Sequence, residues 1–294
     1  MASSTIIDTY PAFAQFWGQA KNEPVDRQID LWLQDYMSHW PELVEKQINC
    51  HAGRGYDWRQ VARERIFPFL DQREAGMADA RENLLRCVAP VGRTAQEVFG
   101  SDLDLVFVLY VGIGCGAGWA ASYSGKPAVL FGLEKIAKLN WTALETVEAL
   151  TAHELGHILH LHLRGEAGEP EAAGDFAALY GEGVAKRSEE LILGESRHYE
   201  TLYHKDDWLK WCTDNRAWLA AEFLRKVDQG EPTNVFFGDW FKVRDHSQCG
   251  YFLGLEVVRA WEENLSFQAI VVMPPDKVNT RVRDTLQEMA AEAL

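Results

Sequence analysis

The chain has 294 residues, of which 47% are hydrophobic and 25% are charged, so it can build a sizeable core in one large or two small domains. Its formal net charge of −15 at pH 7 argues against nucleic acids or anionic membranes as main partners. The start of the chain has neither a basic segment nor an apolar one, so we expect no signal peptide. Five scattered cysteines favour a reducing, cytoplasmic location over a disulfide framework.

The first third of the chain is predicted to be helical. Residues 8–48 have the pattern of amphipathic helices rich in aromatic side chains, interrupted near Pro24 and Pro41. Residues 57–89 carry further helix, with basic and acidic residues alternating on an exposed face. This part is therefore expected to be a helical region that packs on the rest of the protein.

A small sheet is predicted next. The continuous apolar run from Leu103 to Val111 is typical of a buried strand. Ala120–Ser124 and Ala128–Gly132 have the pattern of two shorter strands around a turn at Ser124 and Gly125. We interpret the glycine-rich segment 112–118 as a turn between strands, because it lacks the Lys-Ser/Thr ending of a phosphate-binding loop.

The most informative residues, His153, Glu154 and His157, lie in an apolar segment, Trp141–Leu163, that is predicted to be one buried helix. Because the two histidines are four residues apart, they share a helical face and can bind one metal ion. Imidazole nitrogens are good ligands for zinc. Glu154 is close enough to reach a water on that ion. The alternative is a pair of hydrogen-bonded core histidines with a partly exposed Glu154.

A catalytic zinc site usually has three protein ligands and one open position, and a second predicted helix offers the third ligand. This helix is expected to begin at Pro170 and to end before Gly194. Within it, Glu182 lies between Gly181 and Gly183. Each glycine in a helix costs about 1 kcal/mol relative to alanine, so a pair of them indicates that another helix packs closely here. Such close packing is expected if Glu182 reaches a metal held by the motif helix.

The pattern His-Glu-x-x-His, followed by Glu-Gly-x-Ala whose glutamate is 25 positions after the second histidine, resembles the gluzincin-type zinc metallopeptidases. More narrowly, it resembles a bacterial family of zinc-dependent proteases of otherwise unknown function, whose members carry a later Gly-Tyr-x-x-Gly segment, here Gly250–Gly254. The resemblance spans roughly residues 100–260. It implies an α+β, zincin-like fold that is mostly helical, with a small sheet before the motif helix. It also implies one Zn²⁺ per chain with three protein ligands: His153, His157 and Glu182.

The same resemblance implies hydrolysis of a peptide or protein substrate. Glu154 would act as the general base and Tyr251 would stabilise the oxyanion. The side chains that compete with Tyr251 are Tyr180, Tyr199, Tyr203 and His204. Two other functions stay open: a non-catalytic, metal-stabilised binding or regulatory protein, and a zinc hydrolase of a non-peptide substrate.

Three further residues bear on the metal site. His160 is three residues after His157 and is interpreted as a supporting or partly exposed side chain rather than a ligand. Asp175 shares the face of Glu182 and can orient a zinc histidine, the alternative being a solvated carboxylate. Some gluzincins carry an aspartate four residues after the glutamate ligand, where this chain has Lys186, so that contact must come from elsewhere.

The domain organisation follows from these elements. Residues 1–98 are predicted to pack, as a helical region, on a zincin-like catalytic region of residues 99–294, in one continuous globular unit. In zincins, an edge strand before the motif helix pairs with an extended peptide, and by that analogy residues 128–131 are candidates for substrate contact. The alternative is an interior strand. A further hypothesis is that the acidic segment 166–171 favours basic substrates.

Overall fold

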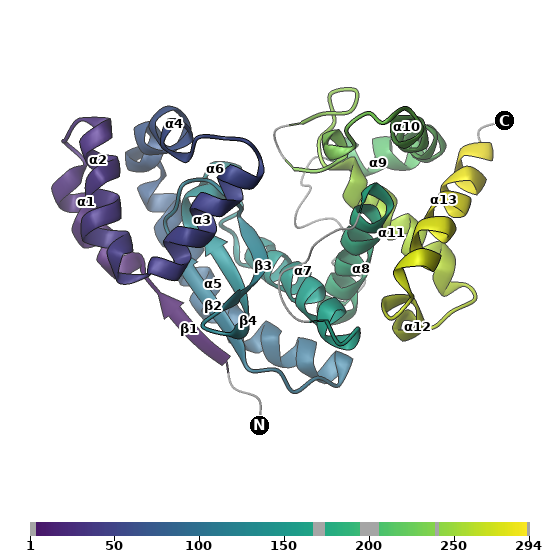
Figure 1. The fold of residues 1–294 in the computed structure, drawn as a ribbon. Coiled ribbons are helices and arrows are strands. Elements are labelled where there is room, and N and C mark those ends of the chain that lie inside the picture. The colour runs from purple at the N-terminus through teal and green to yellow at the C-terminus, as the bar shows by residue number, and fades with distance from the viewer. Residues whose placement is uncertain (1–3, 167–173, 195–205, 239–240, 293–294) are drawn as a thin grey trace. The chain divides into compact units, whose positions relative to one another are not determined.

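The computed structural model shows an α+β protein in which a four-stranded mixed sheet is followed by long helices (Figure 1), and this confirms the predicted fold class. The residues that it describes are 4–166, 174–194, 206–238 and 241–292. Within these residues, none of the helices combines the length and the apolar character needed to cross a bilayer.

The chain divides into two compact units, Met1–Glu154 and Leu155–Leu294. The division falls inside helix α7 (Leu144–Leu163), which is continuous through it. The expected division between residues 98 and 99 stays a prediction.

The first unit begins with a strand, β1 (Ser4–Asp8), that was not predicted from the sequence. The predicted helix interruptions are confirmed, since Pro24 directly precedes α2 and Pro41 begins α3. Proline fits the start of a helix because the N–H groups of the first turn have no acceptor within the helix, so the N–H that proline lacks is not needed. The helices are α1 (Tyr10–Ala20), α2 (Val25–Leu31), α3 (Pro41–Gly53), α4 (Trp58–Val61) and α5 (Leu70–Phe99). Single helical turns connect them at Trp32–Tyr36, Met37–His39, Ala62–Ile66 and Phe67–Phe69.

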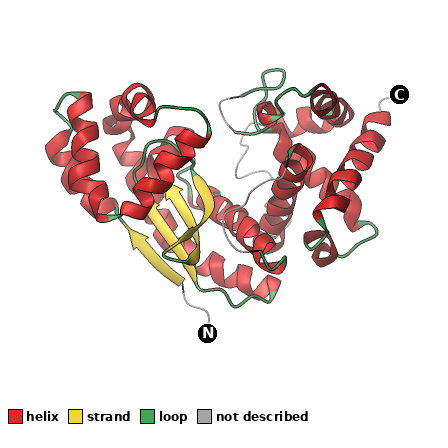
Figure 2. Ribbon diagram, viewed as in Figure 1, coloured by secondary structure: helices red, strands yellow, loops and turns green. Residues whose placement is uncertain are grey.

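The sheet has the strand order β1-β2-β4-β3 (Figure 2), with β2 at Leu105–Tyr110, β3 at Gly118–Tyr123 and β4 at Lys126–Gly132. β1, β2 and β4 are parallel, and β3 is antiparallel to β4. Every residue of β2 is buried, as expected for an apolar strand that is covered on both faces. Ser124 and Gly125 have φ of 51° and 74°. Two positive φ angles are the signature of a two-residue hairpin turn, so the predicted turn is confirmed.

Residues 128–131 lie in an interior strand. β4 pairs with β2 on one side and with β3 on the other, because it inserts between them in parallel with β2. The prediction that residues 128–131 form an exposed edge that contacts substrate is therefore wrong. The alternative, an interior strand, is what the structure shows. The strand at this end of the sheet is β3.

The glycine-rich segment between β2 and β3 folds around a buried carboxylate. Glu134, in helix α6 (Leu133–Leu139), accepts hydrogen bonds from the N–H groups of Gly112 at 2.8 Å and Gly114 at 3.0 Å. Burial raises the pKa of Glu134. The segment is a turn between strands, as predicted, and its backbone donors are used within the protein.

The second unit is helical, and its apolar core is contributed by several of its helices through residues such as Leu179, Phe223, Leu253 and Leu286. The predicted helix end at Gly194 is confirmed, since α8 ends one residue earlier and Gly194 has a φ of 92°. Its predicted start at Pro170 is wrong, because α8 begins at Asp175 and Gly174 before it has a φ of 105°, which is not helical; Pro170 itself lies outside the described residues. The helices are α8 (Asp175–Leu193), α9 (Asp206–Asp214), α10 (Arg216–Gln229), α11 (Cys249–Glu262), α12 (Phe267–Val271) and α13 (Pro275–Ala291), with a single turn at Asn234–Phe236.

Candidate metal centre

The motif helix is α7, which begins at Leu144, three residues later than predicted, and ends at the predicted Leu163. The motif residues on it are enclosed: His153 is 5% exposed and Glu154 is 8% exposed. Burying a histidine and a carboxylate in an apolar helix is unfavourable unless they are paired or ligated. The burial therefore agrees with a role in binding.

Two histidines and one glutamate come together as predicted. One ligand atom from each of His153, His157 and Glu182 lies within 4.8 Å of the other two. The Nε2 atom of His157 and the Oε2 atom of Glu182 are 3.4 Å apart. In a tetrahedral zinc site with bonds of about 2.0–2.1 Å, two ligand atoms are about 3.3 Å apart, so this pair already has the spacing of two zinc ligands.

The three donors fit zinc in kind as well as in spacing. Two imidazoles and one carboxylate form a known catalytic zinc set, and such a set leaves a fourth position open. The side chains of His157 and Glu182 keep 15% and 24% of their surface exposed, so water can reach this part of the group. The structure thus shows a group that can hold a metal ion.

Helix α8, which carries Glu182, contacts α7 at a glycine within the motif. A Cβ atom on Gly156 would lie 2.8 Å from Cβ of Ser188 and 2.9 Å from Cα of Ala185. Ala185 is three residues after Glu182 and so lies on nearly the same face of α8. The absence of a side chain at Gly156 therefore lets the face that carries Glu182 lie directly against α7.

The glycines that flank Glu182 have different surroundings. A Cβ on Gly183 would lie 2.2 Å from the carbonyl oxygen of Gly254 in α11, whereas one on Gly181 would meet nothing within 4 Å. The predicted close helix approach exists at Gly183, but its partner is α11 rather than the motif helix. Gly254 ends the Gly-Tyr-x-x-Gly segment, so this glycine of the segment has a packing role.

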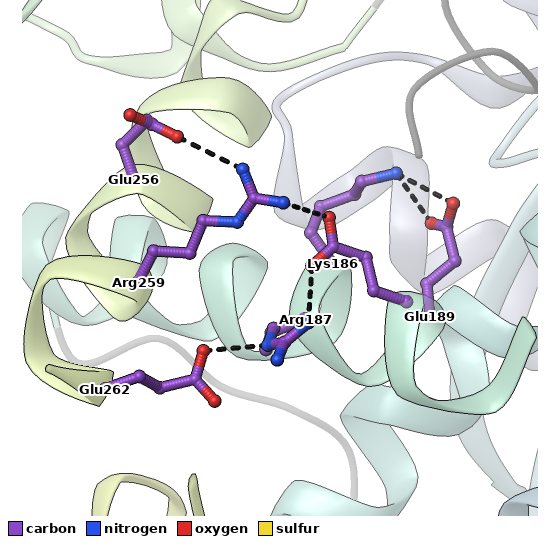
Figure 3. Close-up of polar contacts among 7 residues, drawn as sticks. Lys186, Arg187, Glu189, Glu256, Arg259 and Glu262 are labelled. Carbon is purple, nitrogen blue, oxygen red and sulfur yellow. Dashed lines mark hydrogen bonds and ion pairs between the residues drawn. The ribbon is translucent and has the colours of Figure 1, made fainter. Parts of the chain in front are cut away.

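Ion pairs also join α8 to α11 (Figure 3). Arg187 pairs with Glu262 at 2.7 Å, and Glu190 pairs with Arg259 at 3.0 Å. Glu190 is 3% exposed and also accepts a hydrogen bond from Arg187 at 2.9 Å. The network therefore joins the helix that carries Glu182 to α11 through two ion pairs.

Lys186 stands where some gluzincins have an aspartate. Its ammonium lies 2.8 Å from each carboxylate oxygen of Glu189 (Figure 3), and the two residues are 0% and 2% exposed. An ammonium donates hydrogen bonds and accepts none. As expected, Lys186 cannot supply the acceptor that orients a zinc histidine.

The carboxylate of Glu154 is held by strand β3. Its Oε2 atom accepts a hydrogen bond from the backbone N–H of Ala120 at 3.0 Å. Gly118 lies against the same side chain, since a Cβ there would be 2.9 Å from Cγ of Glu154. These two positions were not predicted from the sequence, because no residue pattern indicates which side chain a backbone amide will meet.

His160 packs in the protein interior rather than at the metal-binding group. Its ring packs edge-on against Tyr180, with ring centroids 5.2 Å apart. Burial lowers the pKa of His160 to about 3. In the part of the chain that the structure describes, His160 does not belong to the metal-binding group. Tyr180 directs its hydroxyl to the carbonyl of Ile270 at 2.6 Å, which leaves it unsuited to an oxyanion.

Tyr251 and Asp175 are the other described residues that were predicted to support the metal site. Tyr251 lies in the first turn of α11, partly buried, with its ring edge-on to Phe237 at 5.9 Å; its role at the oxyanion stays a prediction. Asp175 is exposed and its carboxylate accepts a hydrogen bond from Thr233, which agrees with the solvated alternative. Four of the residues or segments named from the sequence lie wholly or mostly outside the described residues: Tyr199, Tyr203, His204 and the acidic segment 166–171.

The cysteines do not contribute to the metal-binding group. None of the five is part of a disulfide. Burial raises the pKa of the Cys87 thiol to about 12, which makes this thiol a poor metal ligand or nucleophile at neutral pH.

No model of a known protein family matches the chain, and no curated protein and no solved structure is significantly similar to it. The resemblance to the gluzincins therefore rests on the motif residues alone, and the structure adds that three of them form a group suited to a metal ion.

Proposed function

We propose that this protein is a zinc-dependent peptidase of the gluzincin type. The observation that carries the proposal is the convergence of His153, His157 and Glu182 on one metal-sized site, with Glu154 adjacent on the motif helix. A structural metal site has four protein ligands as a rule, whereas three ligands with a free position favour catalysis.

The residues have distinct proposed roles. One Zn²⁺ held by the two histidines and Glu182 would polarise the scissile carbonyl and make water a stronger nucleophile. Glu154 accepts the proton of the attacking water and passes it to the departing amine. Tyr251 is the proposed donor to the oxyanion.

The substrate proposed is an extended peptide or protein segment. β3 is one of the two edge strands of the described sheet and is the one next to Glu154, and a strand edge can bind an extended chain through backbone hydrogen bonds. Because the Ala120 amide is bonded to Glu154, other backbone groups of β3 would make this contact. β3 takes the place of residues 128–131 as the proposed contact. The net charge of −15 supports partners other than nucleic acids and anionic membranes, and a cytoplasmic location remains part of the proposal.

The test uses the zinc-loaded protein and a peptide library. Wild type is expected to cleave peptides, and Glu154→Gln is expected to retain zinc while losing turnover, because an amide cannot accept the proton of water. Cleavage by Glu154→Gln at the wild-type rate would remove Glu154 from the mechanism. Hydrolysis of small esters or amides without peptide cleavage would favour a non-peptide substrate, and zinc binding without any hydrolysis would favour a binding protein.

A further inference from the structure

Strand β3 is a rigid platform in the first unit. It pairs with β4 along its whole length, from Gly118 opposite Phe131 to Tyr123 opposite Lys126. A side-chain hydrogen bond also links β3 to the end of β2, because the indole N–H of Trp119 donates to the Tyr110 hydroxyl at 3.0 Å. A backbone group on this strand is therefore held in a fixed position.

The amide of Ala120 is aimed at Glu154. In an antiparallel ladder, alternate residues direct their N–H and C=O groups away from the partner strand. The N–H of Ala120 donates to Oε2 of Glu154 at 3.0 Å. A hydrogen bond to a carboxylate is roughly twice as strong as one between neutral groups, and Glu154 is 8% exposed, so this contact lies away from bulk water.

Gly118 makes this placement sterically feasible. It is two residues before Ala120, and a Cβ atom there would lie 2.9 Å from Cγ and 3.0 Å from Oε1 of Glu154. The same Cβ would lie 3.0 Å from Cδ1 of Leu150. Any side chain at position 118 must therefore displace Glu154 from its present rotamer, or move the strand.

We propose that the Ala120 amide and Gly118 are positioning elements of the active site: the amide fixes the carboxylate of Glu154, and Gly118 leaves the space that this carboxylate occupies. The catalytic meaning of the inference rests on the proposed function, whereas the contact itself is independent of it. A general base gains from such pre-set geometry, since a misplacement of about 1 Å can reduce a rate by about 100-fold.

The contact is tested first without metal or substrate, by NMR of the Ala120 amide. Glu154→Ala is expected to move its proton signal upfield and to speed its exchange with solvent by about tenfold or more, because a charged acceptor is lost. Glu154→Gln keeps an uncharged acceptor and is expected to give a smaller change. Gly118→Ala should change the Ala120 signal in the same way as Glu154→Ala.

The matched control is Gly18→Ala in α1, where a Cβ meets nothing within 4 Å, and it should leave the Ala120 signal unchanged. An Ala120 signal that is the same in wild type and Glu154→Ala would overturn the inference.

The functional consequence is tested with the zinc-loaded variants. Gly118→Ala is expected to bind zinc at the wild-type stoichiometry and to keep KM within about twofold, while kcat falls on the order of 100-fold. Gly18→Ala should match wild type in all three. Should Gly118→Ala not fold, the NMR comparison of wild type with Glu154→Ala and Glu154→Gln still tests the contact between Ala120 and Glu154. A wild-type kcat in a folded variant with an altered Ala120 signal would refute the positioning role. A wild type without any turnover, but with the NMR changes described, would refute the proposed function and leave the contact standing.

Discussion

Two glycines flank Glu182, and the structure predicts opposite effects for replacing them with alanine. Both substitutions gain helix propensity, worth up to about 1 kcal/mol each. At Gly181 nothing lies within 4 Å of the new methyl group, so Gly181→Ala is expected to stabilise the protein by roughly this amount. At Gly183 the methyl would lie 2.2 Å from a backbone oxygen of α11, whereas ordinary contact begins at 3.4 Å.

The clash at Gly183 cannot be relieved by a side-chain rotation, because the atom that it meets is backbone. Helices α8 and α11 would have to separate by roughly 1 Å, and overpacking of this kind costs about 1–3 kcal/mol. Because the propensity gain is common to both variants, their difference isolates the contact. We expect Gly183→Ala to be less stable than Gly181→Ala by about 1–3 kcal/mol, and to bind zinc more weakly, because the helix that carries Glu182 is displaced.

The assay is urea-induced unfolding followed by tryptophan fluorescence, together with a zinc titration against a competing chelator. Equal stability of the two variants would show that α8 and α11 do not meet closely at Gly183. A less stable Gly183→Ala with unaltered zinc affinity would show that the position of α8 does not control Glu182.

Two further predictions concern buried ionisable groups. Lys186→Met is expected to lower the free energy of unfolding by about 3–5 kcal/mol, because it leaves Glu189 charged and buried; adding Glu189→Gln should recover much of this loss, and an equal loss in the single and double variants would contradict the reasoning. His160 is expected to make the fold sensitive to acid. Unfolded, it takes up a proton at its ordinary pKa of 6.5, whereas burial lowers the folded pKa to about 3, so its contribution to stability is complete above pH 6.5 and is lost as the pH falls towards 3. Between pH 6.5 and pH 5 this loss is about 2 kcal/mol. The unfolding free energy of His160→Phe should therefore fall less over this interval, and an identical pH dependence in both proteins would refute the assignment.

What could be predicted from the sequence is what depends on local spacing. The i, i+4 histidines, the end of α8 at a glycine and the hairpin turn at Ser124 and Gly125 follow from helical periodicity and from φ preferences of single residues. Each is found in the structure. Glu182 joins this group through its distance from His157 along the chain, whereas the glycine beside it that is closely packed, Gly183, contacts α11 rather than the motif helix.

What could not be predicted depends on contacts between distant segments. The apolar run at residues 128–131 is compatible with an edge or an interior strand, and only the insertion of β4 between β2 and β3 decides this. The partner of Gly183 is α11, whereas α8 meets the motif helix through Ala185 and Ser188 at Gly156, and no pattern of single residues indicates which neighbour each face of a helix will have. The role of Ala120 depends on a backbone amide, which every residue except proline carries, so its side chain gives no signal at all.

The most direct test of the central claim is the zinc content of the purified protein, measured by elemental analysis on wild type, Glu182→Ala and His160→Ala after reconstitution. We expect one zinc ion per chain in wild type and in His160→Ala, and a clear loss in Glu182→Ala, because Glu182 belongs to the metal-binding group and His160 does not. No zinc in wild type would make His153 and His157 core histidines, and full zinc in Glu182→Ala would contradict the ligand set on which the proposed function depends.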